Sequence, residues 1–231
     1  MSEIKINNIP VITENNGSVS LTTGTIDANG IILISGNQRA LRFEKNDGTL
    51  DNIIYYNNGT SANKLSIGRD SSVLALRTDG IERMSIDSSG HVTMPYQPSF
   101  NAYLSTGQAI AAGTWTKVNL NTTQWNVGSH FNTSTYRFTA PVDGIYFLSY
   151  TVQFPTGING YLYTGLKVNG TFIHYGNGLK VDAFISDNTL GHGTSYKLNT
   201  NDYVELWAYH DGGETLGSGV TRTHMNGILL G

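Results

Sequence analysis

Asn132-Thr-Ser-Thr-Tyr-Arg-Phe-Thr-Ala-Pro-Val-Asp-Gly-Ile-Tyr-Phe-Leu-Ser-Tyr150 is the stretch of sequence that decides the fold. Aromatic and β-branched residues on either side of its centre predict two β-strands, over Tyr136–Ala140 and Ile145–Phe154. The segment Pro141-Val-Asp-Gly144 predicts the turn between them, because proline fixes its own φ and Gly144 tolerates a positive φ. The stretch is therefore a strand-turn-strand unit.

Further strands are expected around this unit, and no segment has the spacing of an amphipathic helix. Charged residues make up 13% of the 231 residues, and Gly, Asn, Thr, Ser and Tyr are abundant, a mixture that suits strands and turns. The hydrophobic fraction of 39% is adequate for a core. The sequence predicts an all-β protein with further strands at Asn101–Leu104, Lys117–Leu120, Tyr161–Val168, Tyr203–His210 and His224–Leu230.

Residues 1–94 differ from the rest of the chain, because large apolar side chains are sparse there. Isolated hairpins of this kind bury too little surface to offset their conformational entropy, so we expect three copies of the chain to wind into a trimeric β shaft. Pro95-Tyr-Gln-Pro98 predicts the domain boundary, which separates residues 1–94 from a head of residues 98–231. Turn dipeptides punctuate the shaft at Asn16-Gly17, Asn29-Gly30, Asp47-Gly48, Asn58-Gly59, Asp79-Gly80 and Ser89-Gly90.

Composition excludes several functional classes. The formal net charge is −3 and the basic residues are scattered, so we expect no nucleic-acid partner. No apolar run has the length of a signal peptide or a membrane span, which predicts synthesis in a cytosol and no membrane insertion. The absence of cysteine excludes disulfides and thiolate metal sites. Enzyme signatures such as a nucleophile elbow or a phosphate-binding loop are missing, so we expect no enzyme and no cofactor.

The phrase from Asn132 to Tyr150 resembles the central phrase of the C1q and tumour necrosis factor-like domain family. Ala140 replaces the cysteine that precedes the proline in that family. The resemblance implies a ten-stranded jelly roll that forms homotrimers through aromatic-rich inner sheets. Further landmarks follow the family's order over residues 98–231: Pro98-Ser-Phe-Asn-Ala-Tyr-Leu104, Leu166-Lys-Val-Asn-Gly170, Leu198-Asn-Thr-Asn-Asp-Tyr-Val-Glu-Leu206 and Met225-Asn-Gly-Ile-Leu-Leu230.

The segment upstream of the head is similar to a phrase of bacteriophage tail fibres. It reads Leu74-Ala-Leu-Arg-Thr-Asp-Gly-Ile-Glu-Arg-Met-Ser-Ile-Asp-Ser-Ser-Gly-His-Val92, and the opening Ile4-Lys-Ile-Asn-Asn8 resembles such fibres too. The resemblance implies a virion protein assembled in the host cytoplasm, with the N-terminal region bound to other virion proteins.

An aromatic stripe is the first candidate site. Alternation along Tyr203–His210 places Tyr203, Glu205, Trp207 and Tyr209 on one face, and alternation along Tyr161–Val168 places Tyr161, Tyr163 and Lys167 on one face. With the family's strand order, these two strands would flank Ile145–Phe154 in the outer sheet, and the merged stripe would stack on sugar rings. The alternatives are that a loop over Asn169–Val181 covers the stripe, or that another virion protein packs on it.

Loop residues extend the candidate site. His210-Asp-Gly-Gly-Glu214 offers three polar side chains, either as cation ligands or as a plain polar loop, and we expect no metal. Strand parity places the C-terminus at the base of the head and three loops at its apex: Pro141–Gly144, part of Asn169–Val181, and Asp211–Val220. The receptor- or glycan-binding candidates are Tyr161, Tyr163, Trp207, Tyr209, His210, Asp211 and Glu214.

These expectations combine into one leading hypothesis, a homotrimeric tail fibre or receptor-binding adhesin that attaches a phage to a glycan or protein of the host surface. Three heads per fibre would turn weak contacts into lasting attachment. The main alternative is a capsid decoration protein or another structural virion protein. A glycan-depolymerising tailspike is the third reading, and it needs two carboxylates to converge from different loops.

Overall fold

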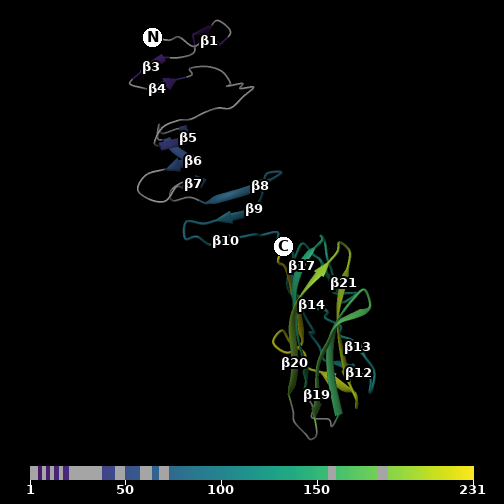
Figure 1. The fold of residues 1–231 in the computed structure, drawn as a ribbon. Helices are drawn as coiled ribbons and strands as arrows, with labels where there is room; N and C mark the ends of the chain where they lie inside the picture. Colours follow the sequence, from purple (N-terminus) through teal and green to yellow (C-terminus); the bar gives the residue numbers. More distant parts are fainter. Residues whose placement is uncertain are drawn as a thin grey trace. The chain divides into compact units, whose positions relative to one another are not determined.

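The computed structural model describes the backbone of residues 73–155, 160–181 and 187–231 and, before residue 73, of seven strands alone. Side chains are described for residues 73–155, 160–175, 178–181 and 187–231. The chain divides into two compact units, Met1–Leu74 and Ala75–Gly231 (Figure 1). No helix in the described part is long and apolar enough to cross a membrane.

The first unit contains short antiparallel pairings. β1 pairs with β2, β3 pairs with β4, and β5, β6 and β7 form a three-stranded sheet. The predicted turns at residues 16–17, 29–30, 47–48 and 58–59 lie outside the described residues, and the trimeric shaft stays a prediction. The strand bounds are β1 (Lys5–Ile6), β2 (Ile9–Pro10), β3 (Thr13–Asn15), β4 (Ser18–Ser20), β5 (Gln38–Glu44), β6 (Leu50–Asn57) and β7 (Lys64–Ile67).

Three consecutive strands, β8 (Leu74–Thr78), β9 (Ile81–Ile86) and β10 (Val92–Thr93), form a sheet at the start of the second unit. The predicted turn at Asp79-Gly80 connects β8 to β9, with φ of 53° at Asp79 and 74° at Gly80. Two positive φ angles are typical of the tight hairpin turns that Asp-Gly favours. Residues 95–98 connect this sheet to the first strand of the jelly roll, which begins at Ser99. The two compact units divide between Leu74 and Ala75, and the domain boundary at residues 95–98 stays a prediction.

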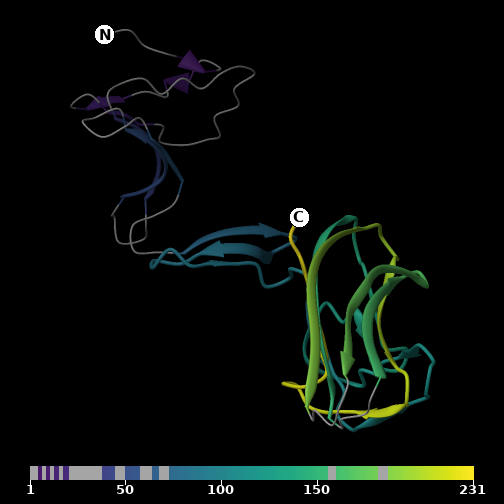
Figure 2. The same ribbon diagram turned by 60° about the horizontal axis from the view of Figure 1, so that its bottom comes forward.

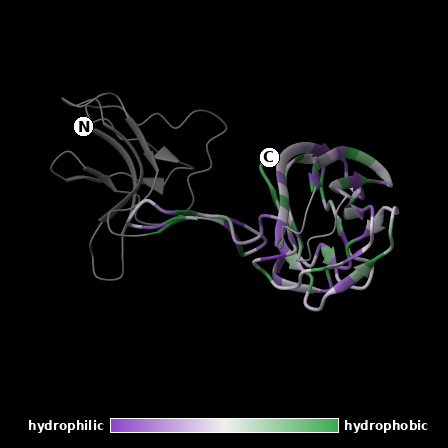
Figure 3. Ribbon diagram, turned by 90° about the horizontal axis from the view of Figure 1, so that it is seen from below, coloured by the Kyte–Doolittle hydropathy of each residue, from purple (hydrophilic) through white to green (hydrophobic). Residues whose placement is uncertain are grey.

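The rest of the second unit is a two-sheet jelly-roll sandwich, so the predicted all-β jelly roll is confirmed. Figure 2 shows its two layers, and in Figure 3 the strands surround a common interior. One sheet has the order β14 (Thr122–Val127), β11 (Ser99–Tyr103), β23 (His224–Leu229), β17 (Gly144–Phe154) and β20 (Asn188–Leu198). The other has the order β15 (Phe131–Asn132), β16 (Arg137–Thr139), β21 (Tyr203–His210), β18 (Gly160–Val168) and β19 (Thr171–Val181), with β13 (Thr116–Lys117) also paired to β21.

Two expectations about strand order were wrong. β18 and β21 do not flank β17, because they pair directly with each other in the opposite sheet. The predicted loop over Asn169–Val181 is mostly the edge strand β19, which pairs with β18. Antiparallel pairing to β18 satisfies the backbone of this Gly-containing segment, and that tertiary pairing overrides its weak strand signal.

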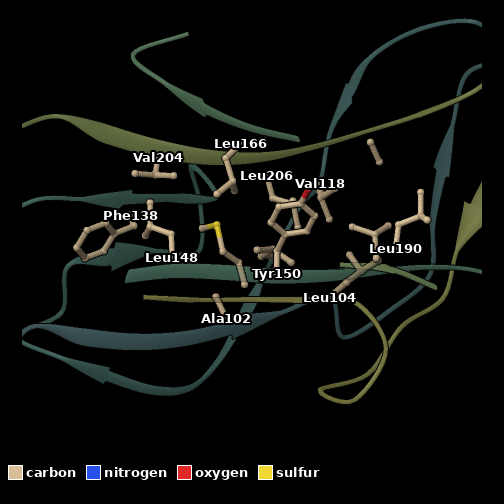
Figure 4. Packing of buried hydrophobic residues seen from close by; sticks show 14 of the residues in the cluster. Ala102, Leu104, Val118, Phe138, Leu148, Tyr150, Leu166, Leu190, Val204 and Leu206 are labelled. Carbon is tan, nitrogen blue, oxygen red and sulfur yellow. The ribbon is translucent and has the colours of Figure 1, made fainter. Parts of the chain in front are cut away.

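The core lies between the inward faces of the two sheets. Figure 4 shows Leu166 and Leu206 of one sheet on the side that faces Leu148 and Tyr150 of the other sheet. Other core side chains in this view are Ala102, Phe138 and Val204. All of these side chains are buried. The hydroxyl of Thr164 donates a hydrogen bond to the Tyr150 hydroxyl at 3.1 Å. Each of these two buried hydroxyl groups therefore has a hydrogen-bond partner in the opposite sheet.

The two ends of the sandwich carry different loops. At the end where the chain terminates, the backbone N–H of Leu229 donates to the Pro98 carbonyl, and that of Ile145 donates to the Gly231 carbonyl. The turn at Pro141–Gly144 therefore lies at this C-terminal end, and its predicted apex position was wrong. Asp211–Val220 lies at the far end, where the Gly217 N–H donates to the Gln153 carbonyl. β12 (Gln108–Ile110) pairs there with β22 (Glu214–Leu216).

Gly144 has a different role from the expected one. It is absent from the residues with positive φ. A Cβ atom at this position would lie 2.5 Å from Cδ1 of Leu229 and 3.1 Å from the Gly231 carbonyl oxygen. Glycine is needed because the C-terminal strand approaches the backbone closely.

Candidate functional site

The candidate site lies on the outward face of the sheet that contains β21 and β18. Backbone pairing places Tyr163 opposite Tyr209, and Gly165 opposite Trp207. Directly paired residues in a sheet point to the same face, so both tyrosine rings leave the core on one side. The sequence predicted this alternation correctly, and the two strands are neighbours without an intervening strand.

Six aromatic side chains form the aromatic platform: Trp115, Tyr161, Tyr163, Phe172, Tyr175 and Tyr209. Trp115 is its centre, with ring centroids 4.6 Å from Phe172, 5.6 Å from Tyr175 and 5.8 Å from Tyr209. Tyr161 and Tyr163 stack at 5.9 Å with their planes 9° apart. Aromatic contacts of this geometry stabilise one another, so the rings form a continuous surface.

Two glycines make room for this surface. A Cβ atom on Gly165 would lie 2.9 Å from the Phe172 ring, and a Cβ atom on Gly178 would lie 2.3 Å from the Tyr163 ring. The rings of Phe172 and Tyr163 therefore lie down over neighbouring strand backbone. This flattens the platform, while Tyr175 at 68% exposure and Tyr161 at 42% stay open to solvent.

Asp211 positions the tyrosines at one edge of the platform. Its Oδ1 accepts a hydrogen bond from the Tyr209 hydroxyl at 2.9 Å, and its Oδ2 accepts one from the Tyr161 backbone N–H at 2.9 Å. The hydrogen bond to this carboxylate, with burial, raises the pKa of Tyr209. Asp211 is thus engaged in orienting the rings.

Trp207 lies beside the platform in a charged environment. Its indole N–H donates to Oε2 of Glu205 at 3.2 Å, and the Nζ of Lys167 lies 3.6 Å from its ring centroid. The ring contacts of the platform do not include Trp207 among the described residues. The predicted stripe is therefore split into an aromatic part and a part built from tryptophan and charges.

Glu205 is the anchor of that charged part, and it is 3% exposed. Its Oε1 accepts hydrogen bonds from Arg137 Nε at 2.7 Å and from Lys117 Nζ at 3.2 Å. Burial alone would raise the pKa of this carboxyl group, but the donors on Arg137, Lys117 and Trp207 together lower it. A buried carboxylate with several charge-assisted donors stays ionised.

The other two candidates from the loop were wrong as exposed binding residues. His210 points into the sandwich and is fully buried, with its Nδ1 accepting the Gly212 N–H at 2.9 Å. Burial lowers its pKa. Glu214 is mostly buried in β22, where its Oε1 accepts the Thr215 N–H. In the part of the chain that the structure describes, no three His, Asp or Glu side chains are grouped to hold a metal ion.

Sequence reasoning missed Trp115, Phe172 and Tyr175, half of the platform. Trp115 follows the turn at residues 112–113 and reaches the face from outside the regular strands. Phe172 and Tyr175 lie in β19, which was expected to be a loop. The aromatic and β-branched run Thr171-Phe-Ile-His-Tyr175 was the available strand signal.

Comparison with known proteins gives the following matches. The family model described as the C1q domain matches residues 99–228. The globular domain of zebrafish complement 1qA protein is similar at 14% identity and a TM-score of 0.44, covering 58% of this chain and 98% of that chain. Murine APRIL at pH 5.0 gives 12% identity, a TM-score of 0.46, and coverage of 58% and 99%. PRD1 vertex protein P5 gives 16% identity, a TM-score of 0.45, and coverage of 59% and 99%. No curated protein matches the chain.

Proposed function

The chain belongs to the C1q domain family, and on that premise we propose that it is a homotrimeric attachment protein of a bacteriophage particle, a tail fibre whose head contacts the host surface. Residues 98–231 are the head, and residues 1–94 form the shaft and bind other virion proteins. C1q domains typically form homotrimers and are generally non-catalytic binding modules. The proposal adds to this the location on a virion and the role in attachment.

An exposed apolar surface supports trimerisation. The outward face of the β14-β11-β23-β17-β20 sheet carries Phe147 and Ile228, which are opposite each other in the β17–β23 pairing. They are 41% and 42% exposed. Exposed apolar patches of this kind on folded proteins mark protein contacts. We refer to this surface as the apolar face; its large exposed side chains are Trp125, Ile145, Phe147, Ile228 and Leu230.

The aromatic platform is the observation that carries the attachment role. It lies on the sheet opposite the apolar face, so three copies joined through their apolar faces would each keep a platform open to solvent. Tyrosine and tryptophan rings combine an apolar surface with polar edges, which suits a hydrated ligand. A trimer of such heads would bind a surface through several weak contacts at once.

The upstream phrase supports the phage location. Residues 74–92, which resemble tail-fibre sequence, form the β8–β10 sheet immediately before the jelly roll. A segment of this kind in front of a binding head is the arrangement expected of a fibre. The proposal therefore rests on sequence resemblance for the virion and on side-chain geometry for attachment.

Immunogold electron microscopy of intact virions with antibody against residues 98–231 tests the location. Gold at fibre or tail tips is the expected result. Gold spread over the capsid would overturn the tail-fibre assignment and make the protein a decoration protein. A separate incubation of purified protein with host polysaccharide checks for catalysis, and the appearance of new reducing ends would contradict a purely adhesive role.

A further inference from the structure

A group of cationic side chains adjoins the aromatic platform on the same outward face. Lys117 and Arg137 bind the carboxylate of Glu205, and Lys167 lies opposite Glu205 on the neighbouring strand. We refer to these four residues as the basic cluster. Backbone pairing places Lys167 opposite Glu205 and Lys117 opposite Trp207. The cluster therefore continues the rows of side chains that contain the platform.

The charges in this cluster do not balance. Glu205 is one carboxylate, and both Arg137 and Lys117 donate to the same oxygen, Oε1. Lys167 adds a third cation, so the cluster has an excess of two positive charges. The Lys167 ammonium lies over the Trp207 and Phe172 rings, at 3.6 and 4.5 Å from their centroids, and no carboxylate of the described residues is within ion-pair distance of it.

This excess of positive charge is opposite in sign to the net charge of the whole chain. The whole chain has a net charge of −3, and residues 98–231 contain six Lys or Arg against seven Asp or Glu. Three of those six cations lie in the basic cluster. Such local accumulation of one sign on an overall acidic protein favours a ligand of the opposite sign.

Lys167 joins the basic cluster to the platform. The Phe172 ring under its ammonium also contacts Trp115 at 4.6 Å and Tyr175 at 4.9 Å. A ligand that stacks on Trp115 or Tyr175 thus extends within reach of a cation. Asp211, a carboxylate of this face that has no cation bound to it among the described residues, lies at the other edge beside Tyr161 and Tyr209. The face therefore has a positive edge at Lys167 and a negative edge at Asp211.

We propose that the platform binds an anionic saccharide, with sugar rings stacked on the aromatic side chains and a carboxylate or phosphate of the ligand bound by Lys167. The inference rests on the attachment role proposed above and names its ligand class. Lysine suits this role because its ammonium is a compact charge that carries three donors. Repulsion by Asp211 directs the acidic group of the ligand toward the Lys167 edge.

Binding of the purified full-length protein to three polymers tests the proposal: hyaluronan, which carries carboxylates, poly(glycerol phosphate), which carries phosphates, and neutral dextran. At about 50 mM salt, at least one anionic polymer is expected to bind tenfold or more tightly than dextran, and binding is expected to weaken as salt rises and screens the charges. Lys167→Gln is expected to weaken that binding about tenfold. Arg222→Gln, which removes an exposed cation outside both sheets, is the matched control and is expected to have no effect.

The outcomes separate this inference from the proposed function. Dextran binding that equals the anionic polymers, with loss in Tyr175→Ala but not in Lys167→Gln, overturns the anionic ligand and leaves the platform as the attachment site. No binding to either anionic polymer by protein that still labels host cells also overturns the inference. Preference for hyaluronan or for poly(glycerol phosphate) identifies the acidic group as carboxylate or phosphate.

Discussion

On the sheet that ends in β14 and β20, the half-exposed outward side chains of Phe147 and Ile228 form an apolar patch, with polar side chains such as Ser195 beside it. On the opposite sheet the outward side chains are tyrosines, tryptophans and cations that bond to one another. Both faces arise from the same two-residue alternation, and both sheets bury comparable apolar residues inward. The difference lies in the aromatic and charged side chains. An exposed aliphatic and phenyl patch is best covered by another protein surface, whereas a face of interacting tyrosines, tryptophans and cations suits a hydrated ligand.

A charge placed on the apolar face should have the largest effect of all the changes, because it should prevent trimer formation. Ile228→Glu would bury three unpaired carboxylates in the proposed trimer, at a cost of about 3–5 kcal/mol each. Light scattering should then report a species below the roughly 75 kDa of the wild-type trimer, three times the 25.1 kDa chain.

Tyr175→Glu on the platform is the matched control, because it adds the same charge to the other face. It should leave the trimer intact. A folded Ile228→Glu variant that remains trimeric at micromolar concentration would show that this face is not the interface.

Removal of one aromatic ring of the platform should have the next largest effect. It should weaken ligand binding and leave the trimer unchanged. Tyr175→Ala should weaken attachment to host cells about tenfold per head, and by a larger factor in the trimer because three sites act together. Fluorescence of labelled protein on cells measures this. Tyr96→Ala removes a comparably exposed tyrosine outside the head and should bind normally. Equal losses in both variants would exclude a specific role for the platform.

Removal of the buried carboxylate should destabilise the fold by a smaller amount. Glu205→Gln leaves Arg137 and Lys117 without their anion and should lower the free energy of unfolding by about 1–3 kcal/mol in urea titrations. Glu82→Gln, which breaks a half-exposed pair with Arg77 at 4.0 Å, should cost under about 0.5 kcal/mol.

The difference in the free energy of unfolding between wild type and Glu205→Gln should also depend on pH. The pKa of Glu205 is lowered in the folded state, so its stabilising contribution is present above the ordinary value near 4.5 and is lost as pH falls through the folded pKa. The gap between wild type and Glu205→Gln should therefore narrow below about pH 4.5. A gap that stays constant down to pH 3 would contradict the ionised carboxylate.

The smallest effect on stability is expected from a histidine pair at the edge where β19 of one sheet lies beside β20 of the other. His174 of β19 stacks on His192 of β20 with ring centroids 3.5 Å apart. Burial, and then the neighbouring His192, lower the pKa of His174. A lowered pKa means that the unfolded chain binds the proton more readily, so stability should fall as pH drops below about 6.5.

His174→Gln should reduce that slope slightly, as measured by thermal unfolding between pH 7 and 5. Burial also lowers the pKa of His130, His210 and His224, so part of the slope should remain. A His174 ring that titrates at or above 6.5 by NMR would contradict the assignment.

Sequence reasoning succeeded where a strand carried dense aromatic and β-branched residues. Tyr203–His210 has the predicted bounds and faces, and Ile145–Phe154 lies within β17. It failed on β19, which was expected to be a loop, and it predicted no strand at β20; both segments contain glycine, histidine and threonine. Those strands are held by pairing to β18 and β17, and a local window of sequence does not contain that partner.

The candidate site shows the same division. Alternation within one strand identified Tyr161, Tyr163 and Tyr209, because facing is a local property of an extended chain. His210 was misjudged because it was grouped with the loop His210–Glu214, whereas the alternation that buries Leu206 and Ala208 also directs His210 inward. Trp115 was out of reach because its contacts are to residues at least 48 positions away in the chain.

By itself, the sequence determined an all-β chain and the inward and outward faces of its densest strands, since these follow from side-chain chemistry and the two-residue repeat of a strand. The jelly-roll head beginning near residue 98 was implied by the resemblance of its phrases to the C1q and tumour necrosis factor-like family. Only the tertiary structure decided that β18 and β21 are neighbours, that Pro141–Gly144 lies at the C-terminal end, and that two cations converge on Glu205 beside the aromatic platform. These features depend on which distant strands share backbone hydrogen bonds. That choice is made by burial of the whole core, and no local stretch of sequence records it.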